Sequence, residues 1–194
     1  VSFYNQSSDD GPVFPTPTIG MVGLLDEATR ACEVAFRAPG DLIYLIGDPV
    51  EDMACSEYAY AFHQHWSPPP HLDLAAERAL QRGLPQLIRA ELLHSAHDVS
   101  SGGLLVALAE CAMAGGLGFD VRATAAFRPD AYWFGEAGGR VVVSLAPLKE
   151  AAFLEQARAL GLPVRALGTV TEAGEWRADG QPVGTNEIQT PLYR

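Results

Sequence analysis

The chain has 194 residues, of which 48% are hydrophobic and 19% charged, a composition typical of a globular protein that buries a core of its own. Its net charge of -11 argues against a nucleic-acid-binding surface and against docking on an anionic membrane, because either would need clustered Lys and Arg. A phosphorylated ligand is not excluded, since a helix N-terminus and one or two arginines can bind it locally.

Three cysteines (Cys32, Cys55 and Cys111) are odd in number and widely spaced, so we expect reduced thiols in a soluble, cytoplasmic protein. Neither they nor the histidines show the paired spacing of a metal site. No basic region followed by an apolar run marks a signal peptide, and the longest apolar run, residues 104–114, is too short to span a bilayer. Since Val1 reads as part of a strand already under way, we expect a fragment of a longer polypeptide.

Short apolar and β-branched segments bounded by glycine, proline and aspartate predict the strands of a sheet. These segments are residues 2–4, 18–26, 42–47, 119–121, 141–145 and 163–170, with a final hairpin of residues 175–177 and 181–183. The segment 5–17 is rich in Asn, Ser, Asp, Gly and Pro and reads as a loop or linker.

Apolar residues at helical spacing, together with capping residues, predict helices between these strands. Ser56 caps one helix and Asp73 another, and Pro85 predicts a kink or restart within the second because proline removes a helical hydrogen bond. The expected helices are residues 56–65, a helix starting at Asp73, a helix that runs from residue 103 to Gly115-Gly116, and residues 148–160 before Gly161. Helices and strands that alternate in this way indicate an α/β or α+β layered domain.

A polar turn with two adjacent glycines, in residues 95–103, opens directly onto a near-continuous apolar helix. Ser100 or Ser101 can cap this helix, because a hydroxyl accepts a hydrogen bond from a first-turn N–H group. Without β-carbons, Gly102 and Gly103 let another backbone or a ligand approach the positive end of the helix dipole. Two interpretations therefore stay open, tight packing of the helix or an anion-binding site for phosphate.

Two further pairs of charged or titratable residues are candidates for chemistry. His97 and Asp98 resemble an acid–base pair, but adjacent side chains point apart in most conformations, and Asp commonly accepts backbone N–H bonds in a turn. Glu136 and Arg140 flank two glycines before a strand, and an ion pair across that turn is the simplest interpretation. Contact with a cleft or a neighbouring domain is the alternative for all four. No residue is assigned a catalytic role or a metal.

Five stretches of the sequence occur together in a recognisable order. They are Ser2-Phe-Tyr-Asn5, Pro15-Thr-Pro-Thr-Ile-Gly-Met-Val-Gly-Leu-Leu-Asp26, Ser56-Glu-Tyr58, Ser95-Ala-His-Asp-Val-Ser-Ser-Gly-Gly103 and Phe134-Gly-Glu136…Arg140. Together they closely resemble the C-terminal part of phosphoribosylformylglycinamidine synthase. The resemblance covers nearly the whole chain and weakens after Val170. The wider superfamily, which includes aminoimidazole ribonucleotide synthetase and thiamine monophosphate kinase, shares the glycine-opened helix.

The resemblance implies an enzyme that uses ATP, Mg2+ and ammonia from a glutaminase to convert formylglycinamide ribonucleotide to its amidine. It implies an α+β fold of three layers with a central mixed sheet in residues 18–194, of the aminoimidazole ribonucleotide synthetase C-terminal type. Residues 1–17 would be the tail of a preceding ATP-handling domain and a linker. Ser2 would contact the substrate, whereas the ATP and metal ligands would lie mostly outside this chain. We therefore expect the chain alone to be inactive.

The implied partners are the rest of the synthetase chain and a glutaminase subunit, with a small accessory subunit or fused domains. No nucleic acid and no membrane is expected. Self-association of the isolated chain is expected too, because the missing domains would cover apolar surface. Two rival functions remain: a non-catalytic module that binds a nucleotide or partner through the glycine-opened helix, and a sibling ATP-dependent enzyme of the superfamily.

Three departures from the family pattern are visible. Ala54-Cys55 stand where Gly-Gly is usual, Ser101 replaces a residue that is usually acidic, and Ala137-Gly138-Gly139 replace a more polar run. Loss of a carboxylate at position 101 would make the helix N-terminus more receptive to an anion.

Overall fold

The computed structural model of the chain describes residues 7–8, 11–12, 19–25, 27–64 and 67–186. The contacts within the chain divide it into two compact units, residues 1–31 and residues 32–194. This division falls later than the boundary expected after residue 17, and the assignment of residues 1–17 to a preceding domain stays a prediction. The strand expected in residues 2–4 lies outside the described residues.

The first unit contains little regular structure in its described part. Strands β1 (Ser7–Ser8) and β2 (Gly11–Pro12) pair with each other, and a 3-10 helix, η1, follows at Ala28–Arg30. The prediction of a buried strand in residues 18–26 is wrong for the described residues 19–25, which form no strand and are exposed. The segment is apolar and contains β-branched residues, but among the described residues β1 and β2 pair with each other and neither pairs with residues 19–25.

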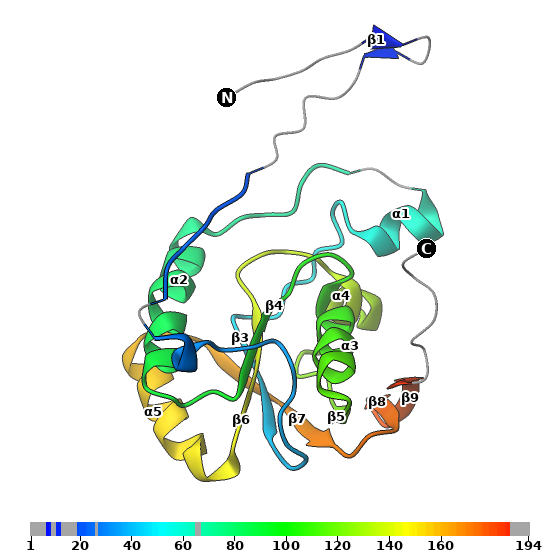
Figure 1. The fold of residues 1–194 in the computed structure, drawn as a ribbon. Coiled ribbons are helices and arrows are strands. Elements are labelled where there is room, and N and C mark those ends of the chain that lie inside the picture. Colours follow the sequence, from blue (N-terminus) through cyan, green and yellow to red (C-terminus); the bar gives the residue numbers. More distant parts are fainter. Residues whose placement is uncertain (1–6, 9–10, 13–18, 26, 65–66, 187–194) are drawn as a thin grey trace. The chain divides into compact units, whose positions relative to one another are not determined.

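The second unit is built on a seven-stranded sheet, drawn in Figure 1, whose strand order is β4-β6-β3-β7-β5-β8-β9. Its strands are β3 (Leu42–Ile46), β4 (Ser95–Asp98), β5 (Gly118–Val121), β6 (Val141–Leu145), β7 (Val164–Thr171), β8 (Glu175–Ala178) and β9 (Gln181–Thr185). Neighbouring strands are antiparallel except β5 and β8, which are parallel. The sheet is therefore mixed, which confirms the prediction.

Helices cover both faces of this sheet (Figure 1). The helices of this unit are α1 (Glu57–His63), α2 (Leu74–Arg89), α3 (Gly103–Gly115), α4 (Pro129–Phe134) and α5 (Glu150–Ala159), with a 3-10 helix, η2, at Pro147–Lys149, and those that pack on the sheet are α2 and α5 on one face and α3 and α4 on the other. None of the helices in the described ranges combines the length and the apolar character needed to cross a bilayer.

The two faces of the sheet carry separate cores because successive residues of a strand point to opposite sides. In β3, Ile43 and Leu45 belong to the core that contains the buried residues of α3, whereas Tyr44 and Ile46 belong to the core that contains those of α2 and α5. All four β3 residues are buried. The three-layer α+β architecture expected for this domain is confirmed.

Most of the expected elements form within a residue or two of the predicted bounds. Ser56 and Asp73 cap α1 and α2 as predicted, and Gly116, with φ of 64°, ends α3. A restart at Pro85 does not occur, since α2 is one helix from Leu74 to Arg89. Leu80 and Leu87 are buried on either side of the proline, and their packing outweighs the lost hydrogen bond.

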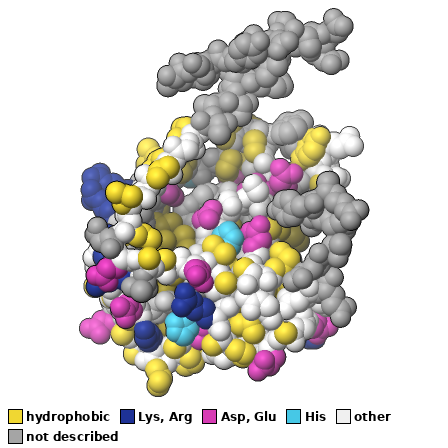
Figure 2. All heavy atoms as spheres, viewed as in Figure 1, with side chains coloured by type: hydrophobic (Ala, Val, Ile, Leu, Met, Phe, Trp, Pro, Cys, Tyr) yellow, Lys and Arg dark blue, Asp and Glu magenta, His cyan; other side chains and the backbone are white. Residues whose placement is uncertain are grey.

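Carboxylates dominate the surface, since the chain carries 24 Asp and Glu but only 13 Lys and Arg. Figure 2 shows Asp and Glu side chains across the middle of one face. Several cations are paired locally, as in the exposed ion pair between Arg165 and Asp48, 2.8 Å apart. Such exposed pairs contribute little to stability. The surface is therefore better suited to cationic than to anionic macromolecules.

Candidate functional site

The carboxylate of Glu136 joins three segments that are far apart in the sequence. Its Oε1 atom accepts a hydrogen bond from the backbone N–H of Glu57 (2.7 Å) and another from that of Gly102 (2.8 Å). Glu57 is the first residue of α1, and Gly102 is the N-cap of α3. We call this arrangement of Glu57, Gly102 and Glu136 the Glu136 junction. A carboxylate is favourable there because it meets the positive ends of two helix dipoles.

The prediction that Ser100 or Ser101 caps α3 is wrong. The N-cap is Gly102, with φ of 83°, and no side chain of the cap residue bonds to the helix. The first amide of this turn donates to Glu136 instead, and the N–H of Gly103 donates to the carbonyl of Ser100 (3.0 Å). A carboxylate 34 residues away thus takes the place of a local cap. Both serines are exposed to solvent.

Gly103 allows a close approach of two backbones at this junction. A β-carbon on Gly103 would lie 2.7 Å from the carbonyl carbon of Phe134, and φ at this residue is 77°. Only glycine fits such a position without a shift of the neighbouring chain. This geometry supports the packing interpretation of the two glycines. The anion-binding interpretation of Ser100, Ser101, Gly102 and Gly103 stays a prediction, and an anion bound to the Gly102 amide would have to replace Glu136 there.

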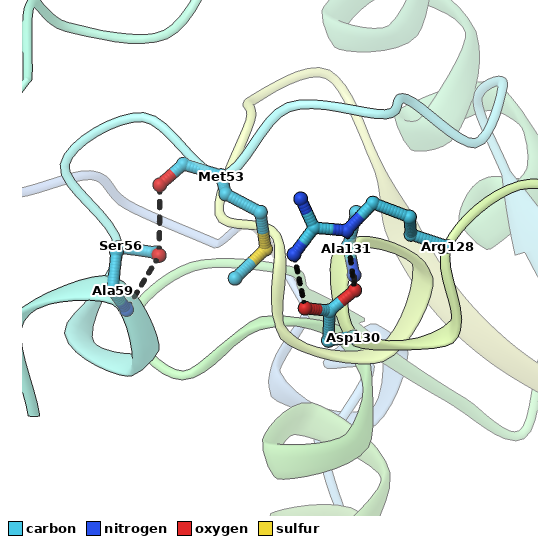
Figure 3. Close-up of polar contacts among 6 residues, drawn as sticks. All are labelled: Met53, Ser56, Ala59, Arg128, Asp130 and Ala131. Atoms are coloured by element: carbon cyan, nitrogen blue, oxygen red, sulfur yellow. Dashed lines mark hydrogen bonds and ion pairs between the residues drawn. The ribbon is translucent and has the colours of Figure 1, made fainter. Parts of the chain in front are cut away.

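The segment before α1 is held by its own cap, shown in Figure 3. Ser56 Oγ accepts from the backbone N–H of Ala59 (3.2 Å) and donates to the carbonyl of Met53 (2.9 Å). Nearby, Arg128 Nε donates to the carboxylate of Asp130 at the start of α4 (3.0 Å), and this pairing keeps the pKa of Asp130 below its ordinary value. Met53 and Arg128 line one pocket.

Aromatic stacking adds a second link between α1 and the Glu136 segment. The rings of Tyr58 and Phe134 are stacked, with centroids 4.9 Å apart and an angle of 20° between their planes. Tyr58 directly follows Glu57, and Phe134 precedes Glu136 by two residues, so both rings lie next to the Glu136 junction in the sequence. Such a pair contributes about 1 kcal/mol beyond the burial of its area. The junction is therefore held by apolar as well as charged contacts.

Arg140 supports Glu136 indirectly and does not form the ion pair that its spacing suggested. No ion pair between the two is found in the described part of the chain. Arg140 is buried, and its guanidinium donates to the carbonyls of Gly135 (2.7 Å) and Ala137 (2.9 and 3.0 Å). These carbonyls flank Glu136 directly. Burial lowers the pKa of the guanidinium, because it penalises the charged form. The carbonyl oxygens offset this penalty by accepting hydrogen bonds from the charged group.

His97 pairs with Glu110 of α3 across the sheet surface. Its Nε2 atom lies 3.0 Å from Glu110 Oε2, whereas its Nδ1 atom lies 3.4 Å from Asp98 Oδ1 and is buried without a hydrogen-bond partner among the described residues. Asp98 itself ends the edge strand β4, and its side chain is 73% exposed. The expectation that Asp98 accepts backbone hydrogens in a turn is therefore not met in this part of the chain.

The structure thus brings Glu136, Arg140 and Gly102 into one network and leaves Ser100 and Ser101 outside it. Ser2 lies outside the described residues, so its contact with substrate stays a prediction. In the described ranges, no group of three or more His, Cys, Asp or Glu side chains is arranged to hold a metal ion.

Sequence reasoning missed the Glu57 amide and Glu110 as partners in this region. The only sequence signal for the Glu57 amide was the Ser56-Glu-Tyr58 motif, and the motif alone does not predict a contact with Glu136. Glu110 follows His97 by 13 positions in another element, and no local spacing rule connects a strand residue to a helix residue at that distance. The strand β4 and the helix α4 that position these groups were also missed.

Comparison with known proteins places this arrangement in a family. Residues 38–180 match the family model described as "AIR synthase related protein, C-terminal domain". The chain belongs to this family. The matched range spans all but one of the strands of the seven-stranded sheet, and it contains the whole Glu136 junction.

The relatives of this family member include synthetase subunits from bacteria. The phosphoribosylformylglycinamidine synthase subunit PurL of Moorella thermoacetica is 41% identical over 169 residues, covering 87% of this chain and 23% of the relative. That of Anaeromyxobacter dehalogenans is 44% identical over 181 residues, covering 88% and 24%. The chain thus spans about a quarter of the length of these relatives.

Solved structures show the same fold. The chain superimposes on the structure of Thermotoga maritima PurL complexed with FGAR with a TM-score of 0.70 and 21% sequence identity, covering 81% of this chain and 28% of that chain. At this level of identity the likeness establishes the fold alone. It agrees with the mixed sheet and the three layers described above.

Proposed function

We propose that this chain is the C-terminal part of a synthetase subunit of phosphoribosylformylglycinamidine synthase. The observation that carries the proposal is 41% identity to PurL over 87% of the chain. The larger enzyme would convert formylglycinamide ribonucleotide to formylglycinamidine ribonucleotide by phosphorylating the amide oxygen with ATP and displacing phosphate with ammonia. Ammonia would come from glutamine on a glutaminase subunit.

Within this enzyme we assign the described part of the chain a supporting role. The Glu136 junction fixes the starts of α1 and α3 relative to each other, since one carboxylate bonds to both. The amides of Gly102 and Gly103 are already engaged, and no metal-ligand cluster is found among the described residues. We therefore propose that the residues that bind ATP and Mg2+ lie mostly in the rest of the synthetase and not in this part of the chain. Ser2 would supply a substrate contact.

The proposed partners are the remaining part of the synthetase chain, the glutaminase subunit and a small accessory subunit, and the proposed location is the cytoplasm. The solved structure of PurLQS from Thermotoga maritima supports an assembly of several subunits for that protein. The curated relatives are themselves named as subunits.

The test compares the 194-residue chain with the longer polypeptide that contains it. We expect the longer polypeptide, supplied with ATP, Mg2+, ammonia and formylglycinamide ribonucleotide, to form the amidine, and the chain alone to form none. Mass spectrometry of the product is the measurement. Amidine from the chain alone contradicts the supporting role, and its absence from the longer polypeptide contradicts the proposed function.

A further inference from the structure

An open groove of about 680 Å³ runs beside α2, outside the Glu136 junction. Its floor is apolar, because Leu80, Val99 and Val141 line it and are 7%, 4% and 6% exposed. Leu84 and Pro85 form its wall on the side of α2 and are only partly buried. The groove therefore offers an apolar surface that the described residues leave open to a ligand.

Carboxylates stand at the rim of this groove. Glu77 and Asp98 line it, and the Asp98 side chain is 73% exposed. The lining also includes Arg140, but its guanidinium donates to the carbonyls of Gly135 and Ala137 and is not directed to a ligand. The electrostatic potential at the rim favours a cation.

A neighbouring pocket extends the same charge pattern. This pocket, of about 330 Å³, shares Glu77 with the groove and is also lined by Asp73, which caps α2, and by Asp48, which pairs with Arg165. The arginines of α2 lie elsewhere, since Arg78 and Arg82 line a different pocket on this helix. Helix α2 therefore presents Glu77, its one acidic residue, toward the groove and presents Arg78 and Arg82 away from it.

We propose that the groove binds an extended segment of another protein that carries a lysine or arginine flanked by apolar residues. The aliphatic stem of such a side chain packs on the apolar floor while its charged head meets Glu77 and Asp98. The groove follows α2 from Glu77 to Pro85, a length of about 12 Å at the rise of an α-helix. That length accommodates about four residues of extended chain.

The net charge of the molecule argues against two other kinds of occupant for this groove. A second copy of the chain also carries a net charge of -11, so self-association through this groove would bring like charges together. An anionic ligand would meet the same carboxylates. A basic segment of a different protein is the occupant whose charge and shape both match. This inference goes beyond the proposed enzymatic function, and its test requires no enzyme activity.

The experiment measures binding of a short synthetic peptide to the 194-residue chain by isothermal titration calorimetry. The probe is Gly-Leu-Arg-Leu-Arg-Gly with blocked ends, and its counterpart has Glu in place of both Arg. We expect the Arg peptide to bind and the Glu peptide not to bind. The double variant Glu77→Gln/Asp98→Asn should weaken binding about tenfold, since two ion pairs are lost.

A matched control separates the groove from the general acidity of the chain. Glu155 and Glu172 are exposed and lie outside the groove, so Glu155→Gln/Glu172→Gln changes the net charge equally and should leave binding unchanged. A photo-crosslinking version of the peptide should label residues of α2, residues 98–99 or residues 138–141. Equal weakening by both double variants, labelling elsewhere, or no binding of the Arg peptide overturns the proposal.

Discussion

At Cys55 the backbone adopts φ of 53°, in the left-handed region that glycine tolerates and other residues rarely adopt. The glycine that the family resemblance implies at this position would adopt such a φ without strain. The cysteine is held by neighbouring groups, since its N–H donates to Ser67 Oγ (2.9 Å) and its Sγ to the carbonyl of Ser67 (2.8 Å). These bonds offset part of the conformational cost.

Comparison of Cys55→Gly with Cys55→Ala isolates that cost, because both variants lose the thiol. We expect the glycine variant to be more stable than the alanine variant by about 1 kcal/mol, the penalty of a β-carbon in the left-handed region. Urea denaturation followed by circular dichroism measures the difference. Equal stability of the two variants would show that the loop relaxes out of this conformation.

Glu136 is the central side chain of the site in the described part of the chain, because two backbone amides from distant segments donate hydrogen bonds to its carboxylate. Glu136→Gln keeps an acceptor oxygen but removes the charge, so both hydrogen bonds weaken and both helix dipoles lose their counter-charge. We expect a loss of about 1 kcal/mol in the free energy of unfolding. The same change at exposed Glu155 is the control and should have no effect. If Glu136→Gln is as stable as the original chain, the junction is not a stabilising feature.

Among the single elements, helix α3 ends in close contact with the backbone of Phe36. A β-carbon on Gly115, the last residue of the helix, would lie 2.2 Å from the carbonyl oxygen of Phe36, whose N–H donates to the carbonyl of Cys111 (3.1 Å). The next residue, Gly116, has open space around it but φ of 64°. The two glycines are therefore required for different reasons.

Alanine substitution distinguishes these reasons. Gly115→Ala should lower the free energy of unfolding by about 2 kcal/mol, because the clash with backbone outweighs the better helix propensity of alanine. Gly116→Ala should lower it by about 1 kcal/mol, the cost of its φ alone. Thermal unfolding of both variants gives the ranking. A more stable Gly115→Ala variant would contradict the close contact between α3 and Phe36.

Elements with strong local patterns could be predicted from the sequence, and those that depend on distant partners could not. The apolar run of β3 and the capping residues Ser56 and Asp73 carry their own signals, and these elements form as expected. Residues 19–25 also contain β-branched residues but pair with no strand in the described part of the chain, so composition alone was misleading there. The strand β4 was hidden in a polar stretch, because its pairing with β6 comes from residues 141–144.

The candidate site shows the same limit. The three motifs that meet at Glu136 were recognised one by one, but their contact was not, since its two amide donors precede Glu136 by 79 and 34 residues. The spacing of Glu136 and Arg140 suggested an ion pair, whereas burial of the arginine among carbonyls gives it other partners. Contacts of this kind follow from the tertiary packing around the sheet and not from local sequence.

For the whole molecule, the apolar segment 19–25 makes self-association of the isolated chain an expected property. Met21, Val22 and Leu24 are 91%, 99% and 97% exposed. We expect the mean mass in sedimentation to rise with protein concentration and with salt, because salt screens the net charge of -11 that opposes association. The variant Met21→Ser/Val22→Ser/Leu24→Ser should be monomeric under the same conditions. A strictly monomeric original chain at high concentration contradicts this expectation.

The strand order has a consequence for how the protein is made. The central strand β3 pairs with β6 and β7, so that Leu42 lies opposite Leu145 on one side and Thr169 on the other. A ribosome releases the N-terminal part first, and β3 therefore emerges about 100 residues before either neighbour. During that interval its Leu-Ile-Tyr-Leu-Ile run has two unpaired edges, the condition under which strands aggregate. The centre of this sheet is complete only after β7 has been synthesised, so the order of synthesis leaves the most apolar strand without its partners for most of the length of the chain.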